Sequence, residues 1–457
     1  MSDIVKKAVR STITYAPVIL ALVGLVYVYW WLLSQATWNL IGYGWRGDSY
    51  DSLAASLLEG RADVDPQKIQ IEVFNINGRS FMYFGPFPAI LRLPFVAKAS
   101  AWVGALSPLS CFVASMLSML SVFVLCAYHA RRYPLFAAIL LVGFGLGTPA
   151  LFLAVSTSIY HEAIMWGLAG AMCSVVSLIM IWYGVGRPHI WLCLCACGAA
   201  IALLSRITFG MPAYVAVFVS IVTIIRARKF SLYKTVIACV PVVAAVLAQM
   251  WYNQARFGSP FIAAALSSGS YYLDTSLMGG WFNPARIPDM LRIYFAPGSQ
   301  FFFSEFPFVQ MQRANFSNPA IFFIWKEPIA PLTITSAWLV ALAVVGILVA
   351  IRARSLYTVA TIVAFMATWL PILSFYNVTG RFTAEFLPVL VFLMAYGMMG
   401  DSPWMGSLKA RVLSALLIVW SIGCTVVSTI GWPSMVSGVP LVSERLNLIF
   451  SGNLPLW

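Results

Sequence analysis

The run AIMWGLAGAMCSVVSLIMIWYG, residues 163–184, contains no charged side chain and decides the class of fold. It is longer than the roughly 20 apolar residues that a helix needs to cross a bilayer. Of the 457 residues in the chain, 61% are hydrophobic and 9% are charged, whereas soluble domains carry about 25% charged residues. The sequence therefore predicts an all-α polytopic membrane protein.

Apolar runs of this kind recur along the chain and predict eleven transmembrane helices. They lie at residues 14–35, 109–130, 134–154, 163–184, 189–205, 209–225, 235–252, 330–351, 356–376, 383–400 and 411–432. Two long hydrophilic stretches, residues 36–108 and 253–329, interrupt them and predict two long outer loops with interfacial helices. We expect a single transmembrane domain over residues 1–457, because no soluble domain or tandem repeat is visible.

Basic residues indicate how these helices are oriented. The chain has 28 Lys and Arg against 15 Asp and Glu, a net charge of +13. Its short basic clusters all fall on one side of the predicted spans: Lys6, Lys7 and Arg10; Arg131 and Arg132; Arg187; Arg226, Arg228, Lys229 and Lys234; Arg352 and Arg354; Lys409 and Arg411. The positive-inside rule makes that side cytoplasmic. We therefore expect a plasma (bacterial inner) membrane protein with a cytoplasmic N-terminus, whose long loops and C-terminus face the periplasm or exterior, and no nucleic-acid partner.

Residues 86–106 are the segment that would invert this orientation if they crossed the membrane. They are nearly long enough, but they contain Arg92, Lys98 and three prolines, which suits a helix lying in the interface. Counting them as a span would place eleven basic residues outside. We therefore predict an interfacial helix here.

The eight cysteines all lie in apolar runs, where cysteine behaves as a small hydrophobic residue. Cys193, Cys195 and Cys197 alternate along a predicted helix, so their side chains point in different directions, and no histidine is in register. We expect neither a disulfide scaffold nor a zinc site.

The first outer loop begins with GYGWRGDSYDSLAASLLEGR, residues 42–61. Asp48 and Asp51 stand at the start of a segment of helical composition. One acid would serve as the N-cap of this helix, which leaves the second, just outside the membrane, for function. Further on, IQIEVFNI alternates and is followed by Asn77-Gly78, a pattern typical of a β-hairpin.

Two ionisable residues stand at the top of the long apolar run. Glu162 immediately precedes it, and an acid at membrane depth is a candidate functional residue. The alternative is that Glu162 stabilises the positive N-terminal end of its own helix. His161 is adjacent, and a single histidine is more often structural than catalytic.

Three arginines on the predicted outer side depart from the positive-inside pattern: Arg206, Arg256 and Arg381. Arg206 needs an anion, which is either Glu162 or Asp48 in an ion pair or a phosphate ligand. Arg381 has Glu385 one turn further on, so an i,i+4 ion pair is the simpler explanation there.

Several of these features belong together. They are Asp48 and Asp51 after the first span, followed by an A..LLEG helix; Tyr83-Phe84-Gly85-Pro86 before the interfacial helix; Glu162 between the third and fourth spans; WYN..RFGSP from Trp251 to Pro260; and Arg381-Phe382 with Pro388 at a late span. Over most of its length the chain resembles the GT-C superfamily of integral-membrane glycosyltransferases, which includes protein O-mannosyltransferases and the aminoarabinose transferase of lipid A.

The resemblance implies an inverting enzyme that moves a sugar from a polyprenyl-phosphate carrier to a glycan, lipid or protein acceptor on the outer face. Asp48 would be the general base, with Asp51 as a second catalytic acid, and Glu162 would orient the acceptor or hold a cation. The leaving donor phosphate would be stabilised by arginine: Arg206, Arg256 or Arg381. Contacts to the sugar or acceptor would come from Tyr50, His161, Tyr83, Trp251 and Tyr252.

The resemblance implies no certain cofactor and leaves a divalent metal ion open. Asp48 and Asp51 are not adjacent, unlike the paired acids of the O-mannosyltransferases, and no large C-terminal soluble domain is visible, so acceptor and metal use stay open. Besides donor and acceptor, membrane lipids are the expected partners.

Two other classes of function remain. A lipid-carrier flippase or transporter would place polar groups along several spans and show internal repeats, whereas here the ionisable residues collect at one face. An O-antigen polymerase or ligase would share the outer loop and the arginines. A nucleotide-dependent enzyme is not indicated, because the sequence has no P-loop and no GxGxxG after a strand.

Overall fold

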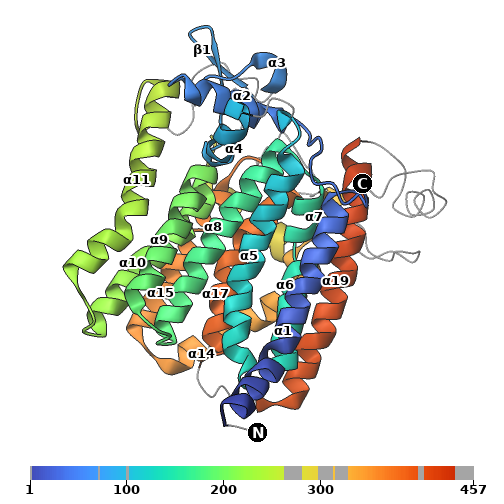
Figure 1. Cartoon of the computed structure of the whole chain (residues 1–457), viewed down its shortest axis with the longest axis vertical. Helices are drawn as coiled ribbons and strands as arrows, with labels where there is room; N and C mark the ends of the chain where they lie inside the picture. Colours follow the sequence, from blue (N-terminus) through green and yellow to red (C-terminus); the bar gives the residue numbers. More distant parts are fainter. Residues whose placement is uncertain are drawn as a thin grey trace, which may run out of the picture.

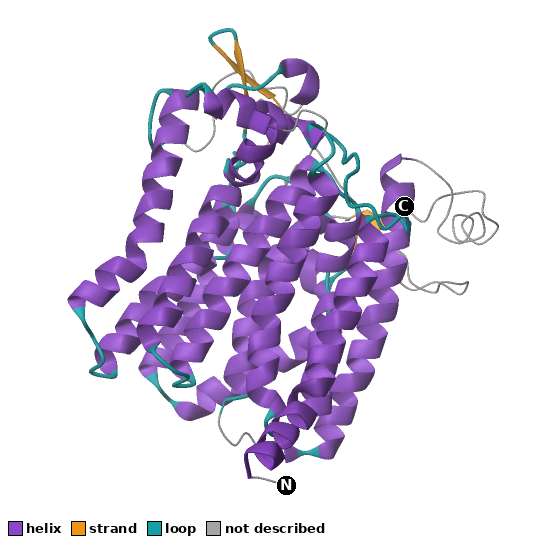
Figure 2. Ribbon diagram, viewed as in Figure 1, coloured by secondary structure: helices purple, strands orange, loops and turns teal. Residues whose placement is uncertain are grey.

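Long helices that run side by side make up most of the computed structural model (Figures 1 and 2). The structure describes residues 3–69, 73–98, 102–261, 280–296, 312–313, 328–399 and 406–437. Within these ranges, seven helices are long and apolar enough to cross a membrane. They are α1 (Asp3–Leu33), α5 (Ser107–Ala130), α8 (Ile159–Trp182), α9 (Pro188–Ser205), α10 (Ile207–Arg226), α11 (Leu232–Phe257) and α19 (Leu408–Ser437). The chain has the architecture of an all-α polytopic membrane protein, as its sequence predicts.

Each of the other four predicted spans is divided in two. They become α6 (Pro134–Leu146) with α7 (Ala150–Val155), α13 (Leu332–Thr335) with α14 (Ala337–Ala353), α15 (Leu356–Ala367) with α16 (Leu370–Ser374), and η5 (Gly380–Phe386) with α17 (Leu387–Gly397). At three of the breaks, Pro149, Pro371 and Pro388 stand at the start of the second helix. Proline suits the first turn of a helix but breaks the hydrogen-bond ladder of its interior. These four spans are therefore not single helices.

The centre of the bundle is α8, the helix that contains the long apolar run. In its most apolar window, 94% of the residues are buried, and it packs against α5, α9, α10 and α17. Gly170 of α8 faces Gly198 of α9, and a Cβ at either position would press on the backbone of the other helix. Small residues at such a crossing let two helices approach closely. Close packing on several sides therefore fixes the first turn of α8, where Glu162 lies.

One end of the bundle is covered by the first loop, while the N-terminus lies at the other end (Figure 1). This layer contains α2 (Asp48–Leu58), α3 (Pro66–Ile69), β1 (Val73–Ile76), β2 (Arg79–Met82) and α4 (Phe87–Lys98). The predicted hairpin is confirmed, because β1 and β2 pair in antiparallel fashion. Asn77 and Gly78 join them with positive φ values of 50° and 75°, as a type I′ turn requires. At about 1.5 Å per residue, α4 is much shorter than the roughly 30 Å hydrocarbon core, so it is too short to span.

The described part of the second long loop lies against the α16–η5 connection. It contains η3 (Pro284–Arg286) and α12 (Ile287–Phe295), and β3 (Gln312–Arg313) pairs with β4 (Pro328–Ile329). The Asn283 amide donates to the Ser374 carbonyl oxygen at 2.8 Å, and the buried Arg286 donates to the same carbonyl at 3.1 Å. The remainder of this predicted loop and the C-terminal tail after residue 437 lie outside the described residues.

Candidate functional site

A short strand-like contact brings the first turns of α2 and α8 together. The Trp45 amide donates to the Thr157 carbonyl at 3.1 Å, and the Ile159 amide donates to the Trp45 carbonyl at 3.0 Å. Just after this contact, Gly47 packs so closely on the start of α5 that a Cβ there would overlap Ser107. The glycine is therefore required for the close approach, and α2 begins directly beside α5 and α8.

Arg92 of α4 joins two of the predicted catalytic acids. Its Nη2 donates to both carboxylate oxygens of Glu162, at 2.8 and 2.7 Å, and its Nη1 donates to Asp51 Oδ2 at 3.0 Å. The side chains of Arg92, Asp51 and Glu162 are only 3%, 1% and 0% exposed. Two carboxylates and one guanidinium thus form a buried ionic network.

Neighbouring groups extend this network. Arg92 also donates to the Gly47 carbonyl at 2.6 Å and to Ser107 Oγ at 3.0 Å, and Ser107 Oγ donates to Glu162 at 3.0 Å. The Gly104 amide donates to Asp51 Oδ2 at 2.9 Å. Burial raises the pKa of the Asp51 carboxyl, and the Arg92 guanidinium opposes that rise. Asp51 and Glu162 are therefore held in place and covered, and neither faces a substrate from solvent.

Asp48 differs from these two acids. It is half-buried in the first turn of α2, and within the described part of the chain its carboxylate makes no hydrogen bond or ion pair. The predicted N-cap role is wrong for both Asp48 and Asp51, because Gly47 has helical dihedral angles and stands at the N-cap without a side-chain bond. Asp48 is thus an accessible carboxylate in the first turn of a helix.

Arg206 lies at the junction of α9 and α10 and forms an ion pair that the sequence does not predict. Its Nε donates to Glu385 Oε1 at 2.7 Å, so its partner is neither Glu162 nor Asp48. The same contact shows that the expected Arg381–Glu385 pair is wrong, because the short 3-10 helix η5 turns Glu385 toward Arg206. Arg206 is 20% exposed, and its two terminal amino groups donate no hydrogen bond to a residue in the described ranges.

Arg381 lies over an aromatic stack that leads to Asp48. Its guanidinium is 3.9 Å from the centre of the Tyr160 ring, and its Nε donates to Thr379 Oγ1 at 3.1 Å. Tyr160 in turn stacks on Trp45, with ring centres 5.8 Å apart. The stack therefore runs from η5 over the first turn of α8 to Trp45, three residues before the start of α2.

Arg256, the third predicted phosphate ligand, is engaged in packing. It is buried, its Nη1 donates to the Met82 carbonyl at 2.8 Å, and its Nη2 donates to Asn253 Oδ1 at 2.9 Å. Its guanidinium also lies 3.8 Å from the centre of the Tyr252 ring. Arg256 therefore fastens the hairpin to the end of α11.

The five predicted sugar or acceptor contacts fall into two groups. Tyr50, His161 and Tyr252 are buried; the Tyr50 hydroxyl donates to the Ile159 carbonyl at 3.1 Å, and the His161 ring bonds to the Ser156 carbonyl. Tyr83 and Trp251 are exposed. Only the exposed pair can contact a substrate without rearrangement.

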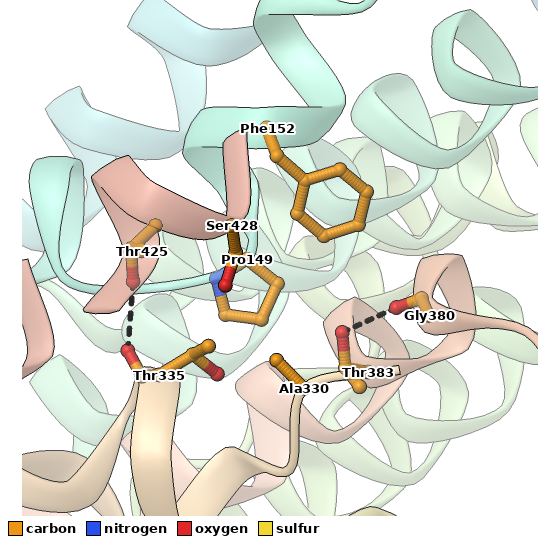
Figure 3. A pocket seen from close by; sticks show the side chains of 8 residues that line it. All are labelled: Pro149, Phe152, Ala330, Thr335, Gly380, Thr383, Thr425 and Ser428. Atoms are coloured by element: carbon orange, nitrogen blue, oxygen red, sulfur yellow. Dashed lines mark hydrogen bonds between the residues drawn. The ribbon is translucent and has the colours of Figure 1, made fainter. Parts of the chain in front are cut away.

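Metal ligands do not gather in the parts of the chain that the structure describes. No group of three His, Cys, Asp or Glu side chains there is placed to hold one ion. A separate cavity of about 10 Å³ lies against η5, and Thr335, Thr383 and Thr425 are among its lining residues (Figure 3). It has room for about one water molecule, so it does not hold a sugar.

Sequence reasoning missed Arg92 and the pairing of Arg206 with Glu385. The signal for Arg92 was its position between Leu91 and Leu93 in an apolar helix, unlike Lys98 at the helix end. A charge in such a position needs a buried partner, and Asp51 and Glu162 were the acids near the same membrane face.

The similarity of this protein to known proteins is one of structure. No protein-family model and no curated protein matches the chain. The structure is similar to the apo crystal structure of the oligosaccharyltransferase from Archaeoglobus fulgidus, with 13% identity and a TM-score of 0.43, over 96% of this chain and 60% of that one. It is also similar to the archaeal oligosaccharyltransferase AglB from Archaeoglobus fulgidus in complex with an inhibitory peptide and a dolichol-phosphate, with 14% identity and a TM-score of 0.44, over 92% of this chain and 56% of that one.

This chain thus spans less than two thirds of the length of either oligosaccharyltransferase chain. Similarity at this level assigns neither a substrate nor the role of a residue.

Proposed function

We propose that this protein is an inverting glycosyltransferase that takes a sugar from a polyprenyl-phosphate donor and passes it to a glycan, lipid or protein acceptor at the outer face of the membrane. The observation that carries the proposal is the state of Asp48: it is the acid of the α2–α8 junction that is accessible and has no partner among the described residues. Arg381 lies over an aromatic stack that ends at Trp45, three residues before Asp48. A general base and a cation for a leaving phosphate thus lie at the same end of the bundle.

The transfer proceeds by one displacement. The acceptor hydroxyl oxygen attacks the anomeric carbon of the sugar, and the bond from that carbon to the phosphate oxygen breaks. The acceptor proton moves to the Asp48 carboxylate, and the electron pair of the broken bond stays on the polyprenyl phosphate. Attack from the side opposite the phosphate inverts the configuration of the anomeric carbon.

The leaving phosphate gains negative charge, which Arg206 and Arg381 stabilise. Arg206 suits this role because Glu385 takes only its Nε, which leaves both terminal amino groups for phosphate oxygens. A guanidinium matches the geometry of phosphate by donating two parallel hydrogen bonds. Arg256 has no place in this scheme, because the hairpin and α11 occupy its donors.

The proposed orientation follows from the ends of the helices. The connections that carry the basic clusters, such as the turn between α10 and α11, lie at the end of the bundle away from the α2–α4 layer (Figure 1). The positive-inside rule then places the site on the outer side. In this arrangement the four divided spans cross the membrane as helix pairs, which gives eleven crossings in the plasma membrane.

Substitution of Asp48 by Asn tests the proposal. We expect membranes that contain the Asp48→Asn protein to transfer sugar from a polyprenyl-phosphate donor at least roughly a hundredfold more slowly, because the amide cannot accept the proton. The matched control is Glu59→Gln, which changes an exposed acid at the other end of α2 and should keep normal activity. Full activity of Asp48→Asn at normal expression would rule out Asp48 as the base.

A further inference from the structure

A buried arginine stands where the resemblance leaves room for a metal ion. A cation held by Glu162 would need free carboxylate oxygens, and both oxygens of Glu162 accept from Arg92 Nη2. Asp51, the nearest second acid in the network, accepts from the other terminal nitrogen. A divalent ion between these acids would have to displace the guanidinium, so the donor set does not fit a resident metal.

We propose that Arg92 is a positioning residue and that its guanidinium bridges Asp51 and Glu162 in the way a bound divalent cation would. This inference deepens the proposed function and rests on it for its activity measurements. The cation is part of the chain, so sugar transfer needs no added divalent metal.

The shape of the guanidinium explains how one side chain can bridge Asp51 and Glu162. Nη1 bonds to Asp51 and to the Gly47 carbonyl, both at the start of α2, whereas Nη2 bonds to Glu162 on α8 and to Ser107 on α5. The planar fork of arginine presents two donor groups in fixed directions, which a lysine ammonium on its flexible stem does not.

The position of Asp48 depends on this fork. Asp48 lies one helical turn before Asp51 on α2, so holding Asp51 and the Gly47 carbonyl fixes the backbone that carries Asp48. Asp48 has no partner of its own in the described ranges that would hold it otherwise. Arg92 therefore acts on the reaction through the placement of the base.

The charges of the network allow a metal to replace the arginine. Two carboxylates and one guanidinium leave one net negative charge, and removing the guanidinium leaves two negative charges that face each other in a buried space. Carboxylate pairs of this kind attract Mn²⁺ and Mg²⁺, which prefer oxygen ligands. An Arg92→Ala protein should thus gain a dependence on metal that the natural protein lacks.

The first experiment compares the natural protein in EDTA and in Mn²⁺. We expect the same rate of sugar transfer and the same thermal unfolding midpoint in both, because Arg92 already bridges the two acids. Loss of transfer in EDTA with recovery in Mn²⁺ would overturn the proposal.

The second experiment uses two substitutions of Arg92. Arg92→Lys should lower kcat roughly a hundredfold at an unchanged KM for the donor, because the base is displaced while Arg206 and Arg381 are intact. Arg92→Ala should unfold at a lower temperature, and Mn²⁺ should raise its midpoint and restore part of its transfer rate. The matched control is Arg61→Ala, which removes an exposed arginine paired with Glu59. Mn²⁺ should change neither the unfolding midpoint nor the transfer rate of this variant.

The outcomes separate this inference from the proposed function. If the natural protein transfers no sugar from any polyprenyl-phosphate donor, the proposed function fails, yet a rise in the Arg92→Ala midpoint with Mn²⁺ still supports the bridging role. If Arg92→Ala unfolds at a lower temperature than the natural protein and Mn²⁺ does not raise its unfolding midpoint, Arg92 is only a packing residue. That result would overturn the inference. If Arg92→Ala does not accumulate in cells, Arg92→Lys decides alone. Sugar transfer by Arg92→Lys at the rate of the natural protein would overturn the inference, and a lower kcat at constant KM would support it.

Discussion

Asp48 and Asp51 lie one turn apart on the same helix, but their surroundings give them different chemistry. Asp51 points into the protein, where burial raises its pKa and Arg92 holds it in an ion pair. Asp48 is half-exposed and has no partner among the described residues. Burial therefore separates Asp51, which helps to build the site, from Asp48, which we propose reacts in it.

The pair of Arg206 and Glu385 provides a prediction at this scale. Arg206→Ala leaves a buried carboxylate without its cation, which costs about 3 kcal/mol of folding free energy, so low activity of this variant alone is ambiguous. The double variant Arg206→Ala with Glu385→Gln removes both charges. We expect it to recover expression and thermal stability but not sugar transfer, because the donor phosphate still lacks its guanidinium.

The corresponding control is Glu385→Gln alone, which keeps Arg206 and should retain measurable transfer. A double variant that regains the natural transfer rate would show that Arg206 serves only as a partner for Glu385. Rates at saturating and limiting donor, together with unfolding midpoints in the same detergent, distinguish these results.

The sequence could place the acids and arginines of the candidate site at one end of the helices, but not their partners. Glu162 and Arg206 were recognised because an ionisable group near a membrane span is costly. Their partners are 70 residues away for Glu162 and 179 for Arg206. Pairings over such separations depend on how α4 and η5 pack, which local pattern does not encode.

At the scale of elements, the hairpin and the long helices were predictable and the divided helices were not. Asn77-Gly78 defines its turn through local backbone preferences, and a run of apolar residues defines a long helix through its length alone. By contrast, Pro371 and Pro388 lie within apolar runs that look continuous on a hydropathy scale. Their effect comes from a missing amide donor, which hydropathy does not register.

The contact between α11 and the hairpin provides a prediction at this scale. Arg256→Met removes the charged hydrogen bond to the Met82 carbonyl, which is worth about 2 kcal/mol, and leaves that carbonyl buried without its donor. The hairpin should open more often, so trypsin should cleave after the exposed Arg79 about tenfold faster or more.

Limited proteolysis of the purified protein measures this effect. The matched control is Trp251→Ala, which changes an exposed side chain near the same end of α11 and should leave the cleavage rate unchanged. An unchanged rate for Arg256→Met would mean that other contacts hold the hairpin.

At the scale of the whole molecule, the proposed orientation can be tested by labelling introduced cysteines in intact cells. Gln67→Cys lies in the α2–α4 layer, and Phe230→Cys lies between α10 and α11; both natural side chains are exposed. A membrane-impermeant maleimide should label Gln67→Cys in intact cells, and Phe230→Cys only after the membrane is opened.

Neither substitution changes a charge, so the basic clusters that set the orientation stay intact. The protein with its natural cysteines alone gives the background. Labelling of Phe230→Cys but not of Gln67→Cys in intact cells would show that the protein has the opposite orientation.

The Arg92 network also has a consequence for the order in which the molecule is made. All of its hydrogen-bonding partners lie between Gly47 and Glu162, so they have been synthesised once the first third of the chain and a little more has left the ribosome. Arg206 and Glu385 arrive later and far apart, and chains fold from the N-terminus as they emerge. The network around Arg92, which we propose positions the base, can therefore close during translation, before the Arg206–Glu385 pair that we propose for phosphate binding exists.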